Sequence, residues 1–320
     1  MVKPIIYITR KIPENLLKPY ENTFNFRMWN ETSKPVPRKV LMEESKQADG
    51  LLCLLTETID KEFLENTGEL KVIANMAVGY DNIDMESAKN KGVIVTNTPD
   101  VLTETTADLT FALLMATARR IVEANLYIKQ DDWKHWSPFL LAGNDVHHKT
   151  IGIVGMGRIG EAVAKRAKGF GMSILYYNRS RKIETEKKLG ATYVNFDELL
   201  EQSDYVTSLV PLTEETKHLF NENAFKKMKS SGIFINVSRG GTMDEEALYN
   251  ALQAQEIKAA GLDVFEEEPI RSNHPLATLD NVICLPHIGS ASVATRSEMI
   301  QLCLENLDAV YKGKKPLTQV

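Results

Sequence analysis

Three glycines constrain the fold of this chain most, because Gly155, Gly157 and Gly160 stand between a β-branched run and a helix-forming segment. Residues 151–154 predict a short buried strand, and residues 161–168 predict the helix that follows. At this spacing the first glycine allows a tight turn, the second lets the backbone approach a pyrophosphate, and the third lets helix and strand pack closely. The pattern therefore predicts a dinucleotide site; the alternative is an ordinary strand, turn and helix.

The segment after the next expected strand, residues 173–177, bears on which dinucleotide binds. An NAD site usually has an acidic residue there, about 20 residues beyond the turn, bonded to the ribose 2′-hydroxyl. Here that place holds Asn178, which does not repel a 2′-phosphate, and Arg179, Ser180 and Arg181 can donate hydrogen bonds to one. We therefore predict a preference for NADPH, with NADH weaker; the alternative is a solvated charge run.

Size, charge and cysteine content exclude several other classes of protein. The chain has 320 residues, enough for about two domains, and its net charge of −5 gives no general attraction to nucleic acid. No stretch approaches 18 consecutive apolar residues, so no membrane span is expected. The three cysteines lack metal-ligand spacing, which predicts no metal site and indicates a reducing compartment. With no signal-peptide pattern at the N-terminus, a cytoplasmic location is expected.

Apolar runs alternate with polar segments long enough for helices, which predicts β/α units with parallel sheets. A helix is expected from Thr103, and the aromatic segment 133–141 could be core, an active-site cover or a subunit contact. Residues 20–40 are expected to be irregular, because Pro35 and Pro37 interrupt them. The expected strands are residues 5–8, 50–55, 70–74, 93–95, 151–154, 173–177, 192–194, 204–209, 232–237, 258–262 and 282–285.

Three later motifs place polar residues just after apolar strands, where open α/β sheets bind ligands. They contribute Arg239, the acidic run Glu266–Glu268 with Asp263 before it, and His287. An Arg can bind a substrate carboxylate or polarise a ketone, and a His held protonated by a carboxylate can donate a proton. Together these side chains are suited to reducing a 2-oxo acid. Gly240 and Gly241 are expected to let a ligand approach closely.

These motifs, together with residues 51–55, 78–82 and 98–108, resemble the D-isomer-specific 2-hydroxyacid dehydrogenase family over nearly the whole chain. The likeness is greatest to its glyoxylate and hydroxypyruvate reductase members. The resemblance implies two doubly wound parallel-sheet α/β domains, a Rossmann-type coenzyme domain (residues 101–287) inserted into a flavodoxin-like substrate domain (residues 1–100 plus 288–320). It also implies a homodimer.

The resemblance also implies a role for each matching residue. Arg239, Glu268 and His287 match the catalytic residues, with His287 as acid/base and Glu268 as its hydrogen-bond partner. The substrate would contact the backbone N–H groups of Val78 and Gly79 and the side chains of Arg239, His287 and Ser290. The cofactor would contact Thr106, Gly155, Gly157, Arg158, Ile159, Asn178, Arg179, Ser180, Arg181, Pro211, Val237, Asp263 and Gly289.

The expected reaction is NADPH-dependent reduction of glyoxylate or hydroxypyruvate to glycolate or D-glycerate. One alternative is a reductase of 2-keto-gluconate or another longer 2-oxo acid, which would share fold and catalytic residues. A phosphoglycerate dehydrogenase fits less well, because NADP preference is atypical there. A further alternative of another class is a dinucleotide-sensing corepressor that binds partner peptides.

Overall fold

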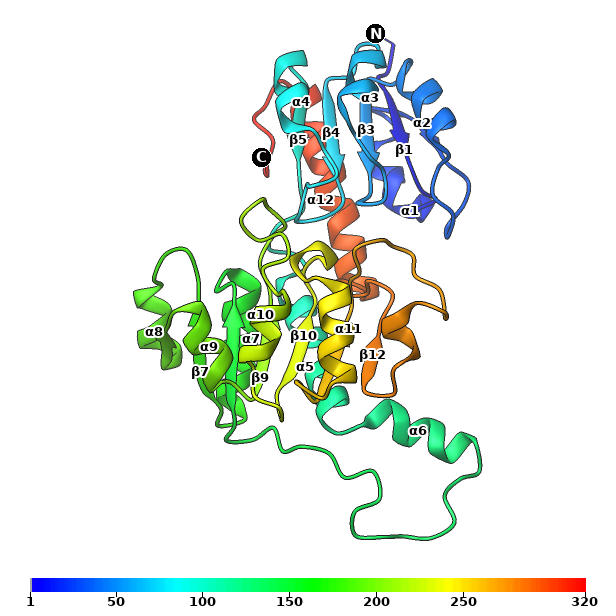
Figure 1. The fold of residues 1–320 in the computed structure, drawn as a ribbon. Coiled ribbons are helices and arrows are strands. Elements are labelled where there is room, and N and C mark those ends of the chain that lie inside the picture. Colours follow the sequence, from blue (N-terminus) through cyan, green and yellow to red (C-terminus); the bar gives the residue numbers. More distant parts are fainter. Residues whose placement is uncertain (1) are drawn as a thin grey trace. The chain divides into compact units, whose positions relative to one another are not determined.

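The computed structural model describes residues 2–320 and divides into two compact units. One unit comprises the residues up to Leu102 together with Ser292–Val320, and the other comprises Thr103–Ala291. We call them unit 1 and unit 2. The chain thus leaves unit 1, forms all of unit 2, and returns to unit 1 with its last helix, as the colours of Figure 1 show.

Unit 1 is built on a five-stranded parallel sheet with strand order β2-β1-β3-β4-β5. This is the flavodoxin-like order of doubly wound folds. Its elements are β1 (Ile5–Ile8), α1 (Glu14–Leu17), the 3₁₀ helix η1 (Lys18–Tyr20), β2 (Asn25–Met28), α2 (Arg38–Ser45), β3 (Gly50–Cys53), α3 (Lys61–Asn66), β4 (Val72–Asn75), α4 (Met85–Lys91), β5 (Ile94–Thr96) and α12 (Val293–Tyr311).

Burial explains why the central strands of unit 1 read as continuous apolar runs. Strands β3 and β4 are buried at every residue, as expected for parallel strands covered on both faces. The C-terminal helix α12 covers one face with a buried apolar stripe, and a Cβ at Gly50 would lie 3.2 Å from the Leu307 side chain. Its buried apolar residues include Ile300, Cys303, Leu304 and Leu307.

The expectation of irregular structure throughout residues 20–40 was wrong in part. Residues Asn25–Met28 form β2, which pairs with β1 at the edge of the sheet. An edge strand is covered less than a central one, and β2 alternates exposed and half-buried residues with no apolar run to mark it. Pro37 then occupies the N-cap position of α2, so the two prolines lie between regular elements.

Unit 2 is built on a seven-stranded parallel sheet with strand order β12-β11-β10-β9-β6-β7-β8. Read from β8, the first six strands follow the classic dinucleotide-binding order. Its elements are α5 (Thr103–Ala118), α6 (Ile121–Lys129), β6 (Thr150–Val154), α7 (Arg158–Gly169), β7 (Ser173–Tyr177), α8 (Ile183–Leu189), β8 (Ala191–Tyr193), α9 (Phe196–Gln202), β9 (Tyr205–Ser208), α10 (Glu222–Lys227), β10 (Ile233–Asn236), η2 (Gly240–Thr242), α11 (Glu245–Gln253), β11 (Ala259–Leu262), η3 (Pro275–Thr278) and β12 (Val282–Cys284).

Two apolar clusters cover the two faces of this sheet. Because successive strand side chains alternate, Ile233 and Ile235 of β10 join the cluster that contains α5 and α7 residues. Phe234, between them, packs in the other cluster with residues of α9, α10 and α11. The predicted fold class, two doubly wound parallel-sheet α/β domains, is confirmed.

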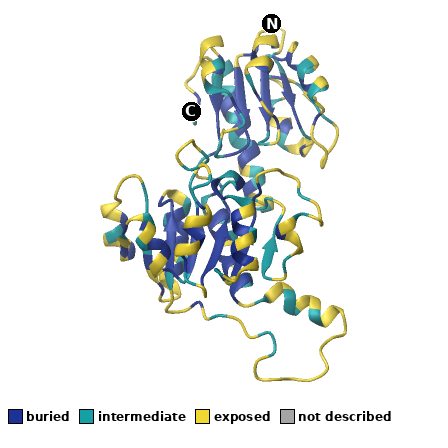
Figure 2. Cartoon of the chain, viewed as in Figure 1, coloured by how far each residue is buried: buried dark blue, intermediate teal, exposed yellow. Residues whose placement is uncertain are grey.

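The segment from α6 to about residue 141 departs from this layered arrangement. None of the residues of α6 is buried, and Trp133, Trp136 and Phe139 are exposed by 56%, 77% and 85%. Figure 2 shows this segment almost wholly exposed or half-buried. The reading of 133–141 as core is therefore wrong. Within residues 2–320, no helix has both the length and the apolar character needed to span a membrane.

Candidate active site

The glycine turn after β6 has the geometry that the spacing predicts. Gly155 has a φ of +104°, a conformation that side chains rarely allow, and a Cβ there would lie 2.7 Å from the Leu209 backbone. A Cβ at Gly160 would lie 2.2 Å from the Gly155 carbonyl oxygen, so α7 could not pack as closely. Around Gly157, by contrast, a Cβ would meet nothing within 4 Å, which leaves the backbone open to a ligand.

The first turn of α7 begins beside that open space. Gly157 is its N-cap residue and supplies no side-chain hydrogen bond to this turn. Arg158 and Ile159 are the first two helical residues. N–H groups at the positive end of a helix dipole suit a pyrophosphate, so this turn fits a dinucleotide.

Residues 178–181, the segment expected to select the dinucleotide, lie next to the glycine turn. Val154 of β6 pairs with Tyr177 of β7, and the Gly155 N–H donates to the Tyr177 carbonyl, so Asn178 follows at the neighbouring strand end. Asn178 donates its side-chain amide to the Ser180 carbonyl at 3.1 Å. The arginine between them, Arg179, is exposed.

Arg181 is engaged in a different way from Arg179. Its guanidinium makes two hydrogen bonds of 2.8 Å to the carboxylate of Glu186 on α8. Tyr176 donates its hydroxyl to the same carboxylate at 2.7 Å and accepts the Lys182 N–H at 2.7 Å. The hydrogen bonds from Arg181 and Tyr176 lower the pKa of Glu186. Glu186 was not predicted as a partner of Arg181, although its position five residues later in the chain could have suggested the pair.

The structure brings His287 and Glu268 together. The Nδ1 atom of His287 lies 2.8 Å from a Glu268 carboxylate oxygen. Burial by itself raises the pKa of Glu268, but the hydrogen bond and charge of His287, with the Phe265 N–H and Arg239, lower it overall. The neighbouring Glu266 instead contacts His218 at 2.8 Å. Because Nδ1 is held by Glu268, Nε2 is the ring atom left to exchange a proton with a substrate.

Asp263 positions the loop that carries His287. Its buried carboxylate accepts the N–H groups of Ile288 and Gly289 at 2.8 and 2.7 Å, and its carbonyl accepts the His287 N–H. Burial raises the pKa of Asp263. His287 has a φ of 53°, which is uncommon for a residue with a side chain and persists only where its surroundings enforce it. Three hydrogen bonds to one aspartate supply that constraint.

Four of the expected cofactor contacts, Thr106, Val237, Asp263 and Gly289, lie around one point in unit 2. A Cβ at Gly289 would lie 3.3 Å from Asp263 and 3.5 Å from both Thr106 and Val237. They come from α5, from the segments after β10 and β11, and from the loop after β12. Ser290 follows directly, and Pro211 lies after β9 and accepts the Thr216 hydroxyl with its carbonyl.

Arg239 follows β10 and is held at its backbone. The Asn236 amide and the Thr242 hydroxyl donate to its carbonyl at 3.1 and 2.8 Å, and its guanidinium lies close enough to affect the pKa of Glu268. The expectation that Gly240 makes room for a ligand was wrong, because a Cβ there would lie 1.8 Å from the Phe265 backbone. A Cβ at Gly241 would lie 3.2 Å from the nearest atom, which belongs to the Leu212 side chain.

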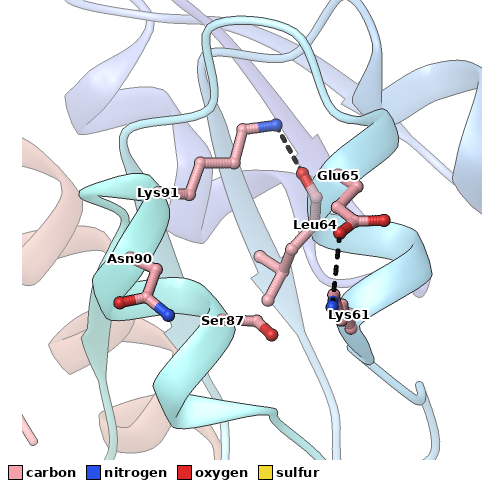
Figure 3. A pocket seen from close by; sticks show the side chains of 6 residues that line it. All are labelled: Lys61, Leu64, Glu65, Ser87, Asn90 and Lys91. Carbon is pink, nitrogen blue, oxygen red and sulfur yellow. Dashed lines mark hydrogen bonds and ion pairs between the residues drawn. The ribbon is translucent and has the colours of Figure 1, made fainter.

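In unit 1, Val78 and Gly79 lie in the loop after β4. The Asn97 amide donates to the Val78 carbonyl at 2.8 Å, and the Asn75 amide donates to the Gly79 carbonyl at 2.9 Å. A separate hollow of about 310 Å³ lies between α3 and α4, and its lining residues are shown in Figure 3. It contains no predicted site residue, and Lys91 points across it to carbonyls of the α3 end.

Comparison with known proteins identifies the class. Residues 111–289 match the family model described as "D-isomer specific 2-hydroxyacid dehydrogenase, NAD binding domain". A glyoxylate reductase of Korarchaeum cryptofilum is 51% identical over 316 residues, which are 98% of this chain and 95% of the relative. The chain therefore belongs to the D-isomer-specific 2-hydroxyacid dehydrogenase family. It carries a nicotinamide-dinucleotide-binding domain and reduces a 2-oxo acid to the hydroxy acid.

Two solved structures narrow the likeness to the glyoxylate reductase type. The glyoxylate reductase from Paecilomyes thermophila has a TM-score of 0.89 and 31% identity, covering 100% of this chain and 99% of that one. The NADPH-dependent glyoxylate/hydroxypyruvate reductase from Sinorhizobium meliloti, in complex with NADP and malonate, has a TM-score of 0.87 and 34% identity, covering 100% and 97%.

Proposed function

We propose that this protein reduces glyoxylate or hydroxypyruvate to glycolate or D-glycerate and prefers NADPH as the electron donor. The observation that carries the reaction is the pair of His287 and Glu268, 2.8 Å apart at strand ends of a dinucleotide-binding sheet. The cofactor, when bound, supplies a hydride for C2 of the 2-oxo acid. Unit 2 is the coenzyme domain and unit 1 the substrate domain in this proposal.

His287 supplies the proton in this reaction. Protonated at both ring nitrogens, it keeps Nδ1 on Glu268 and donates from Nε2 to the ketone oxygen as negative charge develops there. The lowered pKa of Glu268 keeps that carboxylate ionised at neutral pH, so the imidazolium retains a countercharge. In the reverse direction neutral His287 accepts the proton from the hydroxy acid.

Arg239 binds the substrate carboxylate and polarises the ketone. A guanidinium can make two parallel hydrogen bonds to a carboxylate, which fixes orientation as well as position. The backbone N–H groups of Val78 and Gly79, and Ser290, are the other substrate contacts in this proposal. Holding both the carboxylate and the ketone of the 2-oxo acid favours the near-attack geometry that hydride transfer needs.

The preference for NADPH rests on Asn178, Arg179 and Ser180 beside the glycine turn. Arg179 is exposed, whereas Arg181 is paired with Glu186. We therefore assign the main cationic contact with a 2′-phosphate to Arg179, with the Ser180 hydroxyl as a further donor. Arg181 shapes the loop through Glu186 and adds positive charge.

The protein acts as a homodimer in the cytoplasm in this proposal. The segment of α6 and residues 133–139 exposes many large apolar side chains, among them Ile128, Trp136 and Phe139. Exposed apolar surface of this extent usually marks an interaction site. All three cysteines are free, which agrees with a reducing compartment.

The test is an initial-rate assay of glyoxylate, hydroxypyruvate, pyruvate and 2-keto-gluconate, each with NADPH and with NADH. We expect the highest kcat/KM for glyoxylate or hydroxypyruvate and at least about tenfold higher values with NADPH, as one charge-assisted hydrogen bond would give. A preference for 2-keto-gluconate would replace the substrate assignment. Equal values for the two cofactors would overturn the cofactor preference.

A further inference from the structure

We propose that Asn75 and Asn97 are positioning residues for the substrate carboxylate, because they hold the Val78 and Gly79 carbonyls. Together with the bond from Thr98 to Ala77, these bonds turn three consecutive N–H groups away from the donors. This inference rests on the proposed function, in which the Val78 and Gly79 N–H groups are substrate contacts. It adds the side chains that orient this loop, and the Tyr80 N–H as a third donor.

Three consecutive carbonyls of the loop are each tied to the ends of β4 and β5. The Thr98 N–H donates to the Ala77 carbonyl at 2.9 Å. The Asn97 side-chain amide donates to the Val78 carbonyl at 2.8 Å, and the Asn75 amide donates to the Gly79 carbonyl at 2.9 Å. Asn75 is the last residue of β4, and Asn97 directly follows β5, so both donors stand on a rigid sheet edge.

These three bonds determine where the N–H groups point. The peptides that follow Ala77, Val78 and Gly79 are trans, and in a trans peptide the C=O and N–H point in opposite directions. The N–H groups of Val78, Gly79 and Tyr80 therefore face away from Thr98, Asn97 and Asn75 respectively. Within residues 2–320, no acceptor pairs with any of these three N–H groups. Consecutive backbone N–H groups left in this way form a site for an anion.

The two asparagines are themselves fixed. Asn75 is fully buried, and its Oδ1 faces the Cys53 thiol at 3.6 Å, which leaves Nδ2 for Gly79. Asn97 is 8% exposed, and its backbone N–H and C=O both bond to Thr318 near the C-terminus. Removing either side chain would leave a loop carbonyl without its amide donor, so we expect the loop to lose its fixed orientation.

The experiment measures steady-state kinetics of Asn97→Ala and Asn75→Ala with glyoxylate, and inhibition by oxalate, a dianion that cannot be reduced. We expect KM for glyoxylate and Ki for oxalate to rise together by about tenfold, the effect of one charge-assisted hydrogen bond. We expect kcat and KM for NADPH to stay within about threefold, because neither asparagine lies in the dinucleotide-binding unit.

Asn66→Ala is the matched control, since that amide also donates to a backbone carbonyl of unit 1, Glu62, at 2.8 Å. It should leave both constants unchanged. A purely structural role would lower the melting temperature of the Asn97 and Asn75 variants and leave KM and Ki within twofold, which would overturn the proposal. If Asn97→Ala does not fold, Asn75→Ala decides by the same criterion, and if neither folds the asparagines are structural. Lack of glyoxylate turnover by the unchanged protein would instead refute the proposed function.

Discussion

The two sheets of this molecule prepare their strand ends for ligands in different ways. After β10, β11 and β12, unit 2 places side chains that carry charge, namely Arg239, Glu268 and His287. At the ends of β4 and β5, unit 1 places neutral amides, Asn75 and Asn97, that hold a backbone loop. The first arrangement can move a proton, and the second can only bind.

This difference follows from what each task requires. A proton donor must change its charge near neutral pH, so it needs an imidazole and a fixed countercharge. A group that binds a carboxylate must keep its positive electrostatic potential at every pH. Backbone N–H groups do so because they do not titrate. We therefore expect changes in unit 2 side chains to alter turnover and its pH dependence, and changes at the unit 1 loop to alter KM.

His287→Ala tests the comparison with the largest effect. Removing the proton donor should lower kcat for glyoxylate reduction by roughly 10²–10⁴-fold, the usual contribution of general acid catalysis. His274→Ala is the control, because His274 contacts Glu245 at 3.2 Å in the same unit. Near-normal kcat in the His287 variant, measured with both cofactors, would remove it from the mechanism.

Glu268→Gln removes the negative charge from the pair of His287 and Glu268 and leaves a side chain of similar shape. Without the negative charge of Glu268, His287 loses its counterion, so we expect kcat to fall about tenfold to a hundredfold and the pH–rate profile to change. Burial raises the pKa of Glu268, but His287 lowers it overall, so the wild-type carboxylate stays ionised at neutral pH.

Glu266→Gln provides the comparison for that profile. Glu266 belongs to the same acidic run but contacts His218. A shift of the pH profile in both variants would show a general effect of charge in unit 2. A shift in neither would mean that the pair of His287 and Glu268 serves only to hold the loop.

The arginines after β7 give a smaller, cofactor-specific effect. Arg179→Ala should reduce kcat/KM for NADPH by about tenfold and leave the value for NADH unchanged, because it removes a donor to the 2′-phosphate. Arg181→Ala should have a weaker effect, since its guanidinium is paired with Glu186. Equal losses with NADPH and NADH for Arg179→Ala would contradict its assignment.

Most of the strands and the glycine turn could be predicted from the sequence, because each has a strong local pattern. Buried parallel strands read as apolar runs, and Gly155 and Gly160 are demanded by backbone that lies within 3 Å. The edge strand β2 was missed, because half-exposed strands lack such a run. Gly240 was misinterpreted, since its constraint is the Phe265 backbone, distant in sequence.

The roles of Asn75, Asn97 and Glu186 were not predicted either, for a related reason. Each residue acts through one or two hydrogen bonds. The partner in each bond is brought close by the folded chain and is not marked by a local sequence pattern. Asparagine is common in turns, so its presence at a strand end does not distinguish a loop support from a turn residue. Only the position of the Val78 and Gly79 carbonyls does so.

A final comparison asks whether the two units are stabilised independently, by removing one helix N-cap from each. Asp60 caps α3 in unit 1 through the Phe63 N–H, and Asn221 caps α10 in unit 2 through the Ala224 N–H. Asp60→Ala and Asn221→Ala should each cost about 1 kcal/mol. Hydrogen exchange, read by mass spectrometry, should show the loss of protection in the mutated unit; equal losses in both units would mean that they unfold together.

The two caps should differ in their response to acid. Burial raises the pKa of Asp60, but its hydrogen bonds with Phe63 and Arg38 lower it overall. A lowered folded-state pKa contributes stability that is present above the unfolded aspartate pKa, about 3.9, and is lost as pH falls through the folded value. The cost of Asp60→Ala should therefore shrink on acidification below about pH 4, whereas that of Asn221→Ala, an uncharged cap, should stay constant. Urea unfolding of both variants between pH 7 and pH 3 measures this, and parallel pH dependences would show that the charge of Asp60 adds nothing to its cap.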